Sequence, residues 1–147
     1  MSPQERNKQN FQKLFDEVMN RGNFDAADGL ITVDRPDHNP NMPPQFAKGR
    51  EGFKSFFRMF RAGVPDLKFT TELMIAEGDM VAVYGFAEGT HSGEFMGIPA
   101  TGKSFKVTNA DFCRFNSEGK ITDHWGVFDS MGMMRQIGMV PASGQHA

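Results

Sequence analysis

The sequence of 147 residues lacks the features that mark several large classes of protein. It has one cysteine, so it cannot close an internal disulfide, and we expect Cys113 to be a buried structural thiol. Lys and Arg number 16 against 18 Asp and Glu, without the basic excess that nucleic acids and anionic membranes attract. No secretion signal starts the chain, and no apolar run approaches the roughly 20 residues of a membrane span. We therefore expect no nucleic acid and no membrane as partners, and a cytoplasmic location.

Motifs for metals and nucleotides are absent or misplaced. The sequence has neither His-Glu-x-x-His nor a pair of cysteines, and we expect no metal site and no cofactor. Residues 97–104 match the phosphate-binding pattern G-x-x-x-x-G-K-S, but the alternating residues after them predict a strand where that loop needs a helix. Pro99 also removes a backbone donor. We reject nucleotide binding at this segment.

Phenylalanine and methionine, by contrast, are abundant, with 15 Phe and 11 Met against one Tyr and one Trp. Such side chains fill irregular apolar space, and methionine adapts to ligands of varied shape. Two interpretations stay open: a densely filled core, or a pocket for a small apolar organic ligand. For the second we expect an apolar lining that includes Phe15, Phe57 and Phe128.

The first half of the chain has apolar residues at helical spacing. Ser2-Pro3-Gln4-Glu5 has the pattern of a capping box with proline at the first helical position, which predicts a helix start. Four phenylalanines lie on one face of a later helix. The expected segments are a helix over 3–21, a short helix over 24–29, a brief strand over 30–33, a loop with four prolines over 34–45 and a helix from 49 to before Pro65.

The second half alternates with a period of two, which predicts strands. In the first of them Leu67, Phe69, Thr71, Leu73 and Ile75 are expected to share one buried face. The strand over 80–90 is apolar on both faces, so we expect core on one side and a partner chain on the other. The expected segments are strands over 67–76, 80–90, 104–115 and 120–128, and a closing helix capped by Asp129. Helices followed by an antiparallel meander predict a single α+β domain over 1–147, ordered from about 3 to 140.

The strand over 104–115 places polar groups on an apolar face. Asn109 and Asp111 alternate in phase with Phe105, Val107 and Cys113, so their side chains should point inward. A carboxylate on such a face costs free energy unless it is paired, hydrogen-bonded or protonated. Asp111 is therefore a candidate catalytic residue, or else a structural carboxylate satisfied by neighbouring side chains.

Three further residues are candidates for the same site. His124 is on the next strand, where the alternation does not decide which face is inward. A neutral imidazole near Asp111 would carry protons at neutral pH, whereas a buried structural histidine is the other interpretation. His38 and Asn39, in the proline-rich loop, are expected to reach the pocket mouth and bind substrate, or else to form a turn.

A series of short motifs occurs in order along the chain, and together they resemble SnoaL-like polyketide cyclases of the nuclear-transport-factor-2-like superfamily. The resemblance extends from the first helix to Gly138. It implies a cone-shaped, strongly curved antiparallel sheet covered by three to four helices around an internal pocket, and a homodimer. The motifs are Asp37-His38-Asn39-Pro40, Pro65-Asp66-Leu67, Glu77-Gly78-Asp79, Gly89-Thr90-His91-Ser92-Gly93, Phe95-Met96-Gly97-Ile98-Pro99, Thr101-Gly102-Lys103, Gly119-Lys120-Ile121, Asp123-His124-Trp125 and Arg135-Gln136-Ile137-Gly138.

The resemblance also implies a reaction. The cyclases close a ring by intramolecular aldol condensation without metal or organic cofactor, with an aspartate on the last strand as acid and base. Gly126 stands in this sequence where that aspartate belongs. Asn39, Asn109 and Asp111 match pocket positions, the last where the cyclases have a histidine. We hypothesise that Asp111 brings a carboxylate to the same volume from the neighbouring strand, with His124 beside it.

These observations lead to competing functions. The first is an enzyme that removes a proton next to a carbonyl, with Asp111 or His124 as base and amide groups that donate hydrogen bonds to the enolate oxygen. The second is a non-catalytic protein that holds an apolar metabolite, which the missing family aspartate favours. The third is a scaffold that dimerises through an outward face with Tyr84, Phe86 and Trp125.

Overall fold

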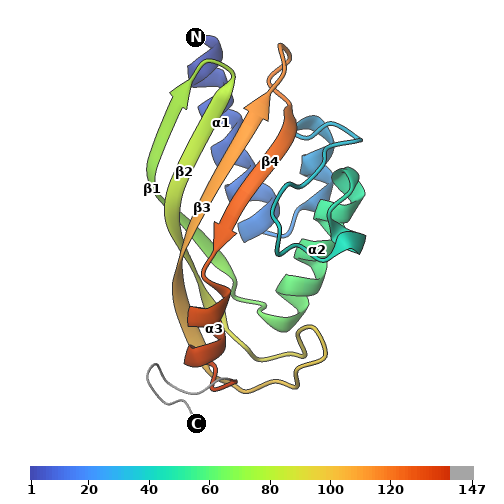
Figure 1. Cartoon of the computed structure of the whole chain (residues 1–147), viewed down its shortest axis with the longest axis vertical. Coiled ribbons are helices and arrows are strands. Elements are labelled where there is room, and N and C mark those ends of the chain that lie inside the picture. Colours follow the sequence, from blue (N-terminus) through green and yellow to red (C-terminus); the bar gives the residue numbers. More distant parts are fainter. Residues whose placement is uncertain (140–147) are drawn as a thin grey trace.

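Helices and strands follow one another in the order expected from the sequence (Figure 1). The computed structural model describes residues 1–139, and the expectation that the ordered part ends near 140 concerns a residue outside this range. The helical segments are α1 (Pro3–Lys13), η1 (Leu14–Asn20), η2 (Phe24–Gly29), η3 (Pro44–Phe46), α2 (Gly49–Gly63) and α3 (Ser130–Gln136). The strands are β1 (Lys68–Glu77), β2 (Met80–Thr90), β3 (Ser104–Phe115) and β4 (Ile121–Phe128). The α+β prediction is confirmed.

The first helix begins where the sequence predicts. The side chain of Ser2 accepts a hydrogen bond from the backbone N–H of Glu5, which satisfies one of the free donors at the helix start. After α1 the chain stays helical but widens into the π-helical segment η1. Phe11, Leu14 and Phe15 on its apolar stripe are buried, so this helix packs its predicted face onto the sheet.

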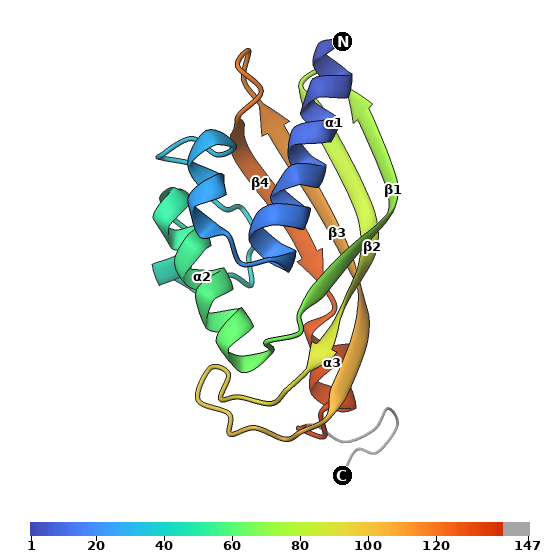
Figure 2. The ribbon, with the colours of Figure 1, turned by 180° about the vertical axis from the view of Figure 1, so that it is seen from behind.

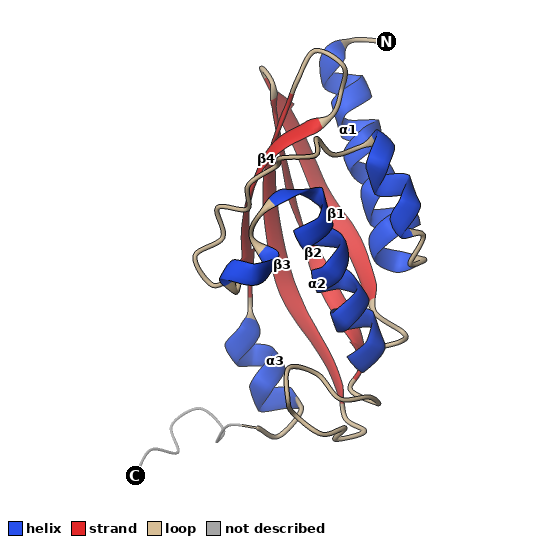
Figure 3. Cartoon of the chain, turned by 90° about the vertical axis from the view of Figure 1, so that its right-hand side faces the viewer, coloured by secondary structure: helices blue, strands red, loops and turns tan. Residues whose placement is uncertain are grey.

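The four strands form one antiparallel sheet in the order β1-β2-β3-β4. Seen from behind, α1 lies in front of the strands and α2 lies beside them, next to β4 (Figure 2). The side view shows α1 to one side of the strands, α2 in front of them and α3 beyond the end of β4 (Figure 3). No helix within residues 1–139 is both long and apolar enough to cross a membrane.

The expectation for the buried face of β1 is wrong past its midpoint. Leu73 and Ile75 lie on the outer face and are 58% and 66% exposed. The reason is an irregularity in register after Thr71, where an extra residue reverses the faces of the rest of the strand. Gly85 lies opposite, and a Cβ there would collide with the carbonyl oxygen of Thr70. The bulge therefore needs a glycine on the partner strand.

The brief strand expected over 30–33 is reduced to a single parallel bridge between Ile31 and Ile121. A second parallel bridge joins Asp37 to His124, so the proline-rich segment also runs along the free edge of β4. The backbone N–H of His38 donates to the carbonyl oxygen of His124 at 2.8 Å. This segment covers the edge of the sheet and brings its side chains next to those of β4.

The two faces of β3 differ as the alternation predicts. Along β3 the inward positions are buried, Asn109 and Asp111 included, and the positions between them are exposed or half-buried. Cys113 is 1% exposed, which confirms its prediction as a buried thiol. The outer face carries large apolar side chains that remain exposed, among them Tyr84 and Phe112. That this face binds a partner chain stays a prediction.

Candidate functional site

A cavity of about 290 Å³ lies between the inner face of the sheet and the helices. Phenylalanine dominates its lining, which explains why this residue is so frequent in the sequence. The predicted lining residues Phe15, Phe57 and Phe128 all contribute to it. The phenylalanines of the lining are Phe11, Phe15, Phe46, Phe53, Phe56, Phe57, Phe60, Phe69, Phe95 and Phe128. The cavity therefore suits an apolar organic molecule.

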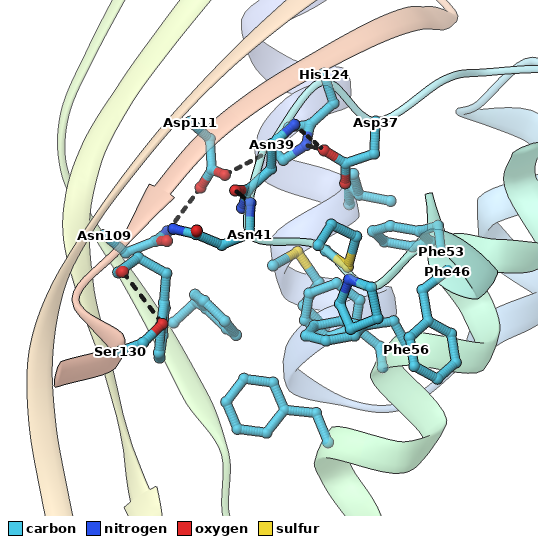
Figure 4. Close-up of a pocket in the computed structure, with 18 of the residues that line it drawn as sticks. Asp37, Asn39, Asn41, Phe46, Phe53, Phe56, Asn109, Asp111, His124 and Ser130 are labelled. Carbon is cyan, nitrogen blue, oxygen red and sulfur yellow. Dashed lines mark hydrogen bonds and ion pairs between the residues drawn. The ribbon is translucent and has the colours of Figure 1, made fainter. Parts of the chain in front are cut away.

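Polar side chains gather at one end of this cavity, where β3, β4 and the loop after η2 meet (Figure 4). Asn39, Asn109, Asp111 and His124, all expected from the sequence, are among them. The full polar set is Arg35, Asp37, Asn39, Asn41, Asn109, Asp111, His124 and Ser130. Four of these side chains bear ionisable groups, and they lie in contact with one another as described next.

Asp111 and His124 form the shortest ionic contact of the cluster. Their strands are antiparallel neighbours, with Asp111 opposite Gly126 and His124 opposite Cys113. The inward side chains of His124 and Asp111 therefore lie diagonally across the strand pair, and Nε2 of His124 is 2.7 Å from Oδ1 of Asp111. The side-chain N–H of Asn109 donates to the other oxygen of Asp111 at 2.6 Å. Both oxygens of this carboxylate thus have a partner.

Gly126 makes room for this arrangement. A Cβ at position 126 would lie 2.8 Å from Cε1 of His124 and 3.1 Å from Oδ1 of Asp111. The imidazole ring therefore lies against the backbone of residue 126, and a larger side chain would displace it. Asp111 lies directly across the strand pair from Gly126, the position at which the family resemblance leads one to expect an aspartate.

Asp37 belongs to the cluster although it is not among the site residues predicted from the sequence. Its Oδ1 lies 3.0 Å from Nδ1 of His124 and accepts the backbone N–H of Asn39 at 2.9 Å. The contact with Nδ1 is an ion pair rather than a hydrogen bond, because Nδ1 meets no acceptor in hydrogen-bond geometry. The other oxygen of Asp37 lies 3.7 Å from Nη1 of Arg35, which is 2% exposed.

His38 lies outside the cavity, so its expected place at the pocket mouth is wrong. Its Nε2 lies 3.0 Å from Oδ1 of Asp123, and its ring stacks on Trp125 at 4.8 Å between centroids. The segment bridged to β4 is extended, and side chains of extended backbone alternate between faces. Asp37 and Asn39 therefore point inward and His38 points outward. The same alternation would have identified Asp37 once Asn39 was placed inside.

The ionic contacts shift the pKa values of the cluster. Burial alone would lower the pKa of His124, but the hydrogen bond to Asp111 and the contact with Asp37 outweigh it and raise this pKa to about 9. Burial raises the pKa of Asp37, yet its contacts with His124 and the N–H of Asn39 bring it below the usual value. Burial also raises the pKa of the Cys113 thiol. His124 is therefore an imidazolium at neutral pH.

These groups are equipped for acid and base chemistry. A carboxylate and an imidazolium meet at the cavity, so a proton acceptor and a proton donor face the same volume. The side-chain N–H groups of Asn39 make no hydrogen bond within residues 1–139, and this side chain lines the same end of the cavity. The described residues hold no group of three or more His, Cys, Asp or Glu side chains arranged to bind a metal ion.

Fold and site together define a class, an α+β protein of the nuclear-transport-factor-2-like kind with a polar cluster at one end of an internal cavity. The sequence matches the SnoaL-like polyketide cyclase family over residues 9–137. The chain belongs to this family. A comparison with curated protein sequences finds no match.

Solved structures support the assignment. IdmH from Streptomyces antibioticus is 32% identical and superposes with a TM-score of 0.79 over 90% of this chain and 98% of its own. TsrD from Streptomyces laurentii is 26% identical, with a TM-score of 0.81 over 92% and 97% of the two chains. A SnoaL-like protein from Jannaschia sp. CCS1 is 24% identical, with a TM-score of 0.83 over 96% and 98%, and this likeness shows the fold alone.

Proposed function

We propose that this protein is a cyclase-type enzyme that acts on a small apolar carbonyl compound by acid and base chemistry without a cofactor. The observation that carries the proposal is the pair formed by Asp111 and His124 at 2.7 Å, at the polar end of a cavity lined by phenylalanine. An apolar cavity binds an apolar substrate, and excluding water strengthens the electrostatic interactions within it.

The proposed reaction is an intramolecular aldol condensation. The carboxylate of Asp111 takes a proton from the carbon next to a carbonyl, and the electron pair of that C–H bond forms an enolate. The side-chain amides of Asn39 and Asn109 donate hydrogen bonds to the enolate oxygen. The enolate carbon then bonds to a second carbonyl carbon, whose oxygen receives a proton from Nε2 of His124. Transfer of the first proton from Asp111 to His124 restores the starting state.

Relatives supply a second line of support. IdmH, which is 32% identical, is described as a candidate polyketide cyclase, and so is a protein from Acidithiobacillus ferrooxidans that is 29% identical. We therefore propose a polyketide-like ketone or ester as substrate. We also propose that residues 1–147 form one domain, since the family match covers residues 9–137.

The test is turnover by matched variants. Candidate ketones and esters are screened with the wild-type protein, and the compound that is converted is then assayed with Asp111→Asn and His124→Gln. We expect each variant to lose about 10²-fold or more in kcat, the usual contribution of general acid–base catalysis. Asp123→Asn and His38→Gln, which alter the pair on the outer face of β4, should keep wild-type turnover. Unchanged turnover in both inner variants would refute the assignment.

A non-catalytic binding protein is the second candidate, and Gly126 favours it because the family aspartate is missing there. In that case Asp111→Asn would keep its affinity for the ligand, and the wild-type protein would convert none of the compounds it binds. Calorimetric titration together with product analysis by mass spectrometry separates the two candidates.

We further propose that the protein is a homodimer that pairs through the outer face of the sheet. Large apolar side chains remain exposed there, which is unusual for a surface that faces only water. The exposed set on this face is Leu73, Ile75, Tyr84, Phe112 and Val127. Sedimentation equilibrium should give twice the chain mass, and Tyr84→Glu should give a monomer. A wild-type monomer at micromolar concentration would contradict the proposal.

A further inference from the structure

We infer that Asp37, supported by Arg35, is a positioning residue that holds the ring of His124 with Nε2 directed at Asp111. The inference rests on the proposed function, because it assigns the part of the same site that sets the orientation of its acid. Asp37 reaches the ring from the loop, on the side opposite to β3, so the imidazole is held between two carboxylates (Figure 4).

The backbone fixes Asp37 relative to His124. The two residues are paired in a parallel bridge, next to which the N–H of His38 donates to the carbonyl oxygen of His124 at 2.8 Å. The N–H of Asp37 itself donates to the carbonyl oxygen of Ala47 at 2.8 Å. The loop is thus joined to β4 at the residue that carries the imidazole, and the carboxylate of Asp37 is 4% exposed.

The two carboxylates contact different nitrogens of the ring. Nε2 lies 2.7 Å from Asp111 in hydrogen-bond geometry, and Nδ1 lies 3.0 Å from Asp37. The group beside one ring nitrogen decides which nitrogen keeps its proton when the ring becomes neutral. The 2.7 Å hydrogen bond to Asp111 keeps a proton on Nε2, and the charge of Asp37 beside Nδ1 favours a proton there too, so the ring stays an imidazolium with Nε2 directed at Asp111. Without Asp37, the ring loses its second proton at a lower pH and can turn over.

Arg35 allows Asp37 to stay ionised in the interior. Its guanidinium lies 3.7 Å from Asp37 and 5.3 Å above the ring of Phe53, and its Nε has no hydrogen-bond partner among the described residues. A buried ion pair with incomplete hydrogen bonds adds little to stability, and apolar residues of similar size serve a core as well or better. The role of Arg35 is then better explained by the negative charge that it keeps on Asp37 than by packing.

The charged and titratable groups around His124 are few. Asp111 and Cys113 face it from β3, and Asp37 with Arg35 behind it faces it from the loop. Asp123 precedes it on β4 but pairs with His38 on the other face. Among these groups, Asp37 is the one that contacts Nδ1. Removing its carboxylate therefore changes the surroundings of that ring nitrogen and leaves the other contacts of the ring in place.

The test is ¹⁵N and ¹H NMR titration of His124, with its signals assigned by their absence in His124→Gln. In Asp37→Asn we expect the pKa of His124 to fall by about 1 unit or more, since an opposite charge within reach shifts a pKa by that amount. Asp123→Asn is the matched control, an aspartate adjacent in sequence but on the outer face, and it should leave the titration of His124 unchanged. Above its pKa the wild-type ring should carry its proton on Nε2, the nitrogen that contacts Asp111 in hydrogen-bond geometry.

A second variant covers the case in which Asp37→Asn leaves Arg35 buried without a partner and does not fold. Arg35→Met combined with Asp37→Asn removes the pair as a neutral unit, and the pKa of His124 should still fall. An unchanged pKa in a folded variant would overturn the inference, as would a wild-type ring that is neutral near pH 7. If the pKa behaves as expected but no compound is converted, the role of Asp37 stands and the proposed reaction fails.

Discussion

The strand β4 lies between two histidine–aspartate pairs, one on each face of the sheet. On the inner face His124 meets Asp111 at 2.7 Å, and on the outer face His38 meets Asp123 at 3.0 Å. The inner imidazole side chain is 18% exposed and the outer one is 40% exposed. The two pairs have the same chemical groups at nearly the same distance. A difference in the strength of the two pairings therefore comes from their surroundings.

The inner pair has a second carboxylate and lies beside an apolar cavity, whereas the outer pair lies at a half-exposed surface. Asp37 adds its charge to that of Asp111, and together they raise the pKa of His124 to about 9. The outer imidazole instead stacks on Trp125 at a half-exposed surface, where water weakens electrostatic contacts. Close contact between a histidine and an aspartate therefore marks a candidate site only where burial makes the pairing strong and a cavity lies beside it.

The largest predicted effect is on stability, when the carboxylate of the inner pair is removed and the loss is compared with that from removing the carboxylate of the outer pair. Asp111→Ala leaves an imidazolium and the amide of Asn109 without a partner in the interior, so we expect a loss of about 3 kcal/mol or more in the free energy of unfolding. Asp123→Ala on the outer face should cost less than about 1 kcal/mol. Urea unfolding of both variants checks this, and equal losses would show that burial does not distinguish the pairs.

The second prediction concerns pH. The pKa of His124 is about 9 in the folded protein and 6.5 when unperturbed, so below pH 6.5 both states are protonated and the stabilisation is complete. Above pH 6.5 the unfolded state releases its proton first, and the stabilisation disappears as the pH rises through about 9. Each pKa unit corresponds to about 1.4 kcal/mol, and we expect a loss of about 3 kcal/mol between these limits.

Urea unfolding at a series of pH values measures this loss, and His124→Gln is the control. The buried thiol of Cys113 also lowers stability at alkaline pH, because its pKa is raised in the folded state and the unfolded thiol ionises first. That contribution is present in both proteins, so the difference between them isolates His124. A difference that is the same at pH 6.5 and pH 9.5 would refute the prediction.

Much of the inner pair could be predicted from the sequence, because a strand has a fixed period. Alternation along β3 placed Asn109 and Asp111 inward, and the burial of both confirms it. The helices and the other strands were predicted by the same means, with apolar periods of 3.6 and two residues. The bulge in β1 was missed, since an extra residue leaves no mark in composition and reverses the pattern only from Leu73 onward.

The residues contributed by the loop were the hardest to predict. The segment over 34–45 has no hydrophobic period, so its sequence does not show which side chains point inward, and the prediction names His38 for its chemistry but not Asp37. Only the bridge to β4 makes this segment extended and determines which of its side chains face the cavity. That pairing joins residues 87 positions apart in sequence, and no local pattern in the loop encodes it.

A smaller effect is expected from the glycine beneath the inner pair. Gly126→Ala would bring a Cβ within 2.8 Å of Cε1 of His124, which cannot retreat without lengthening its bond to Asp111. We expect a loss of about 1 to 3 kcal/mol, as for other overpacked sites, together with a changed NMR shift for His124. Val127→Ala, at an exposed position of the same strand, should cost less than about 1 kcal/mol. An alanine at 126 that is tolerated without either change would show that the ring has room to move.

The smallest effect is expected from the outer pair itself. His38→Ala removes the contact with Asp123 and the stacking on Trp125, both at a half-exposed surface. Because water and salt screen such pairs, the free energy of unfolding should fall by less than about 1 kcal/mol, and the difference should shrink further at high salt. Thermal unfolding at low and high ionic strength measures it. A loss above 2 kcal/mol that persists in salt would mean that this face is covered in solution, as in a dimer that buries His38 against a second copy of the chain.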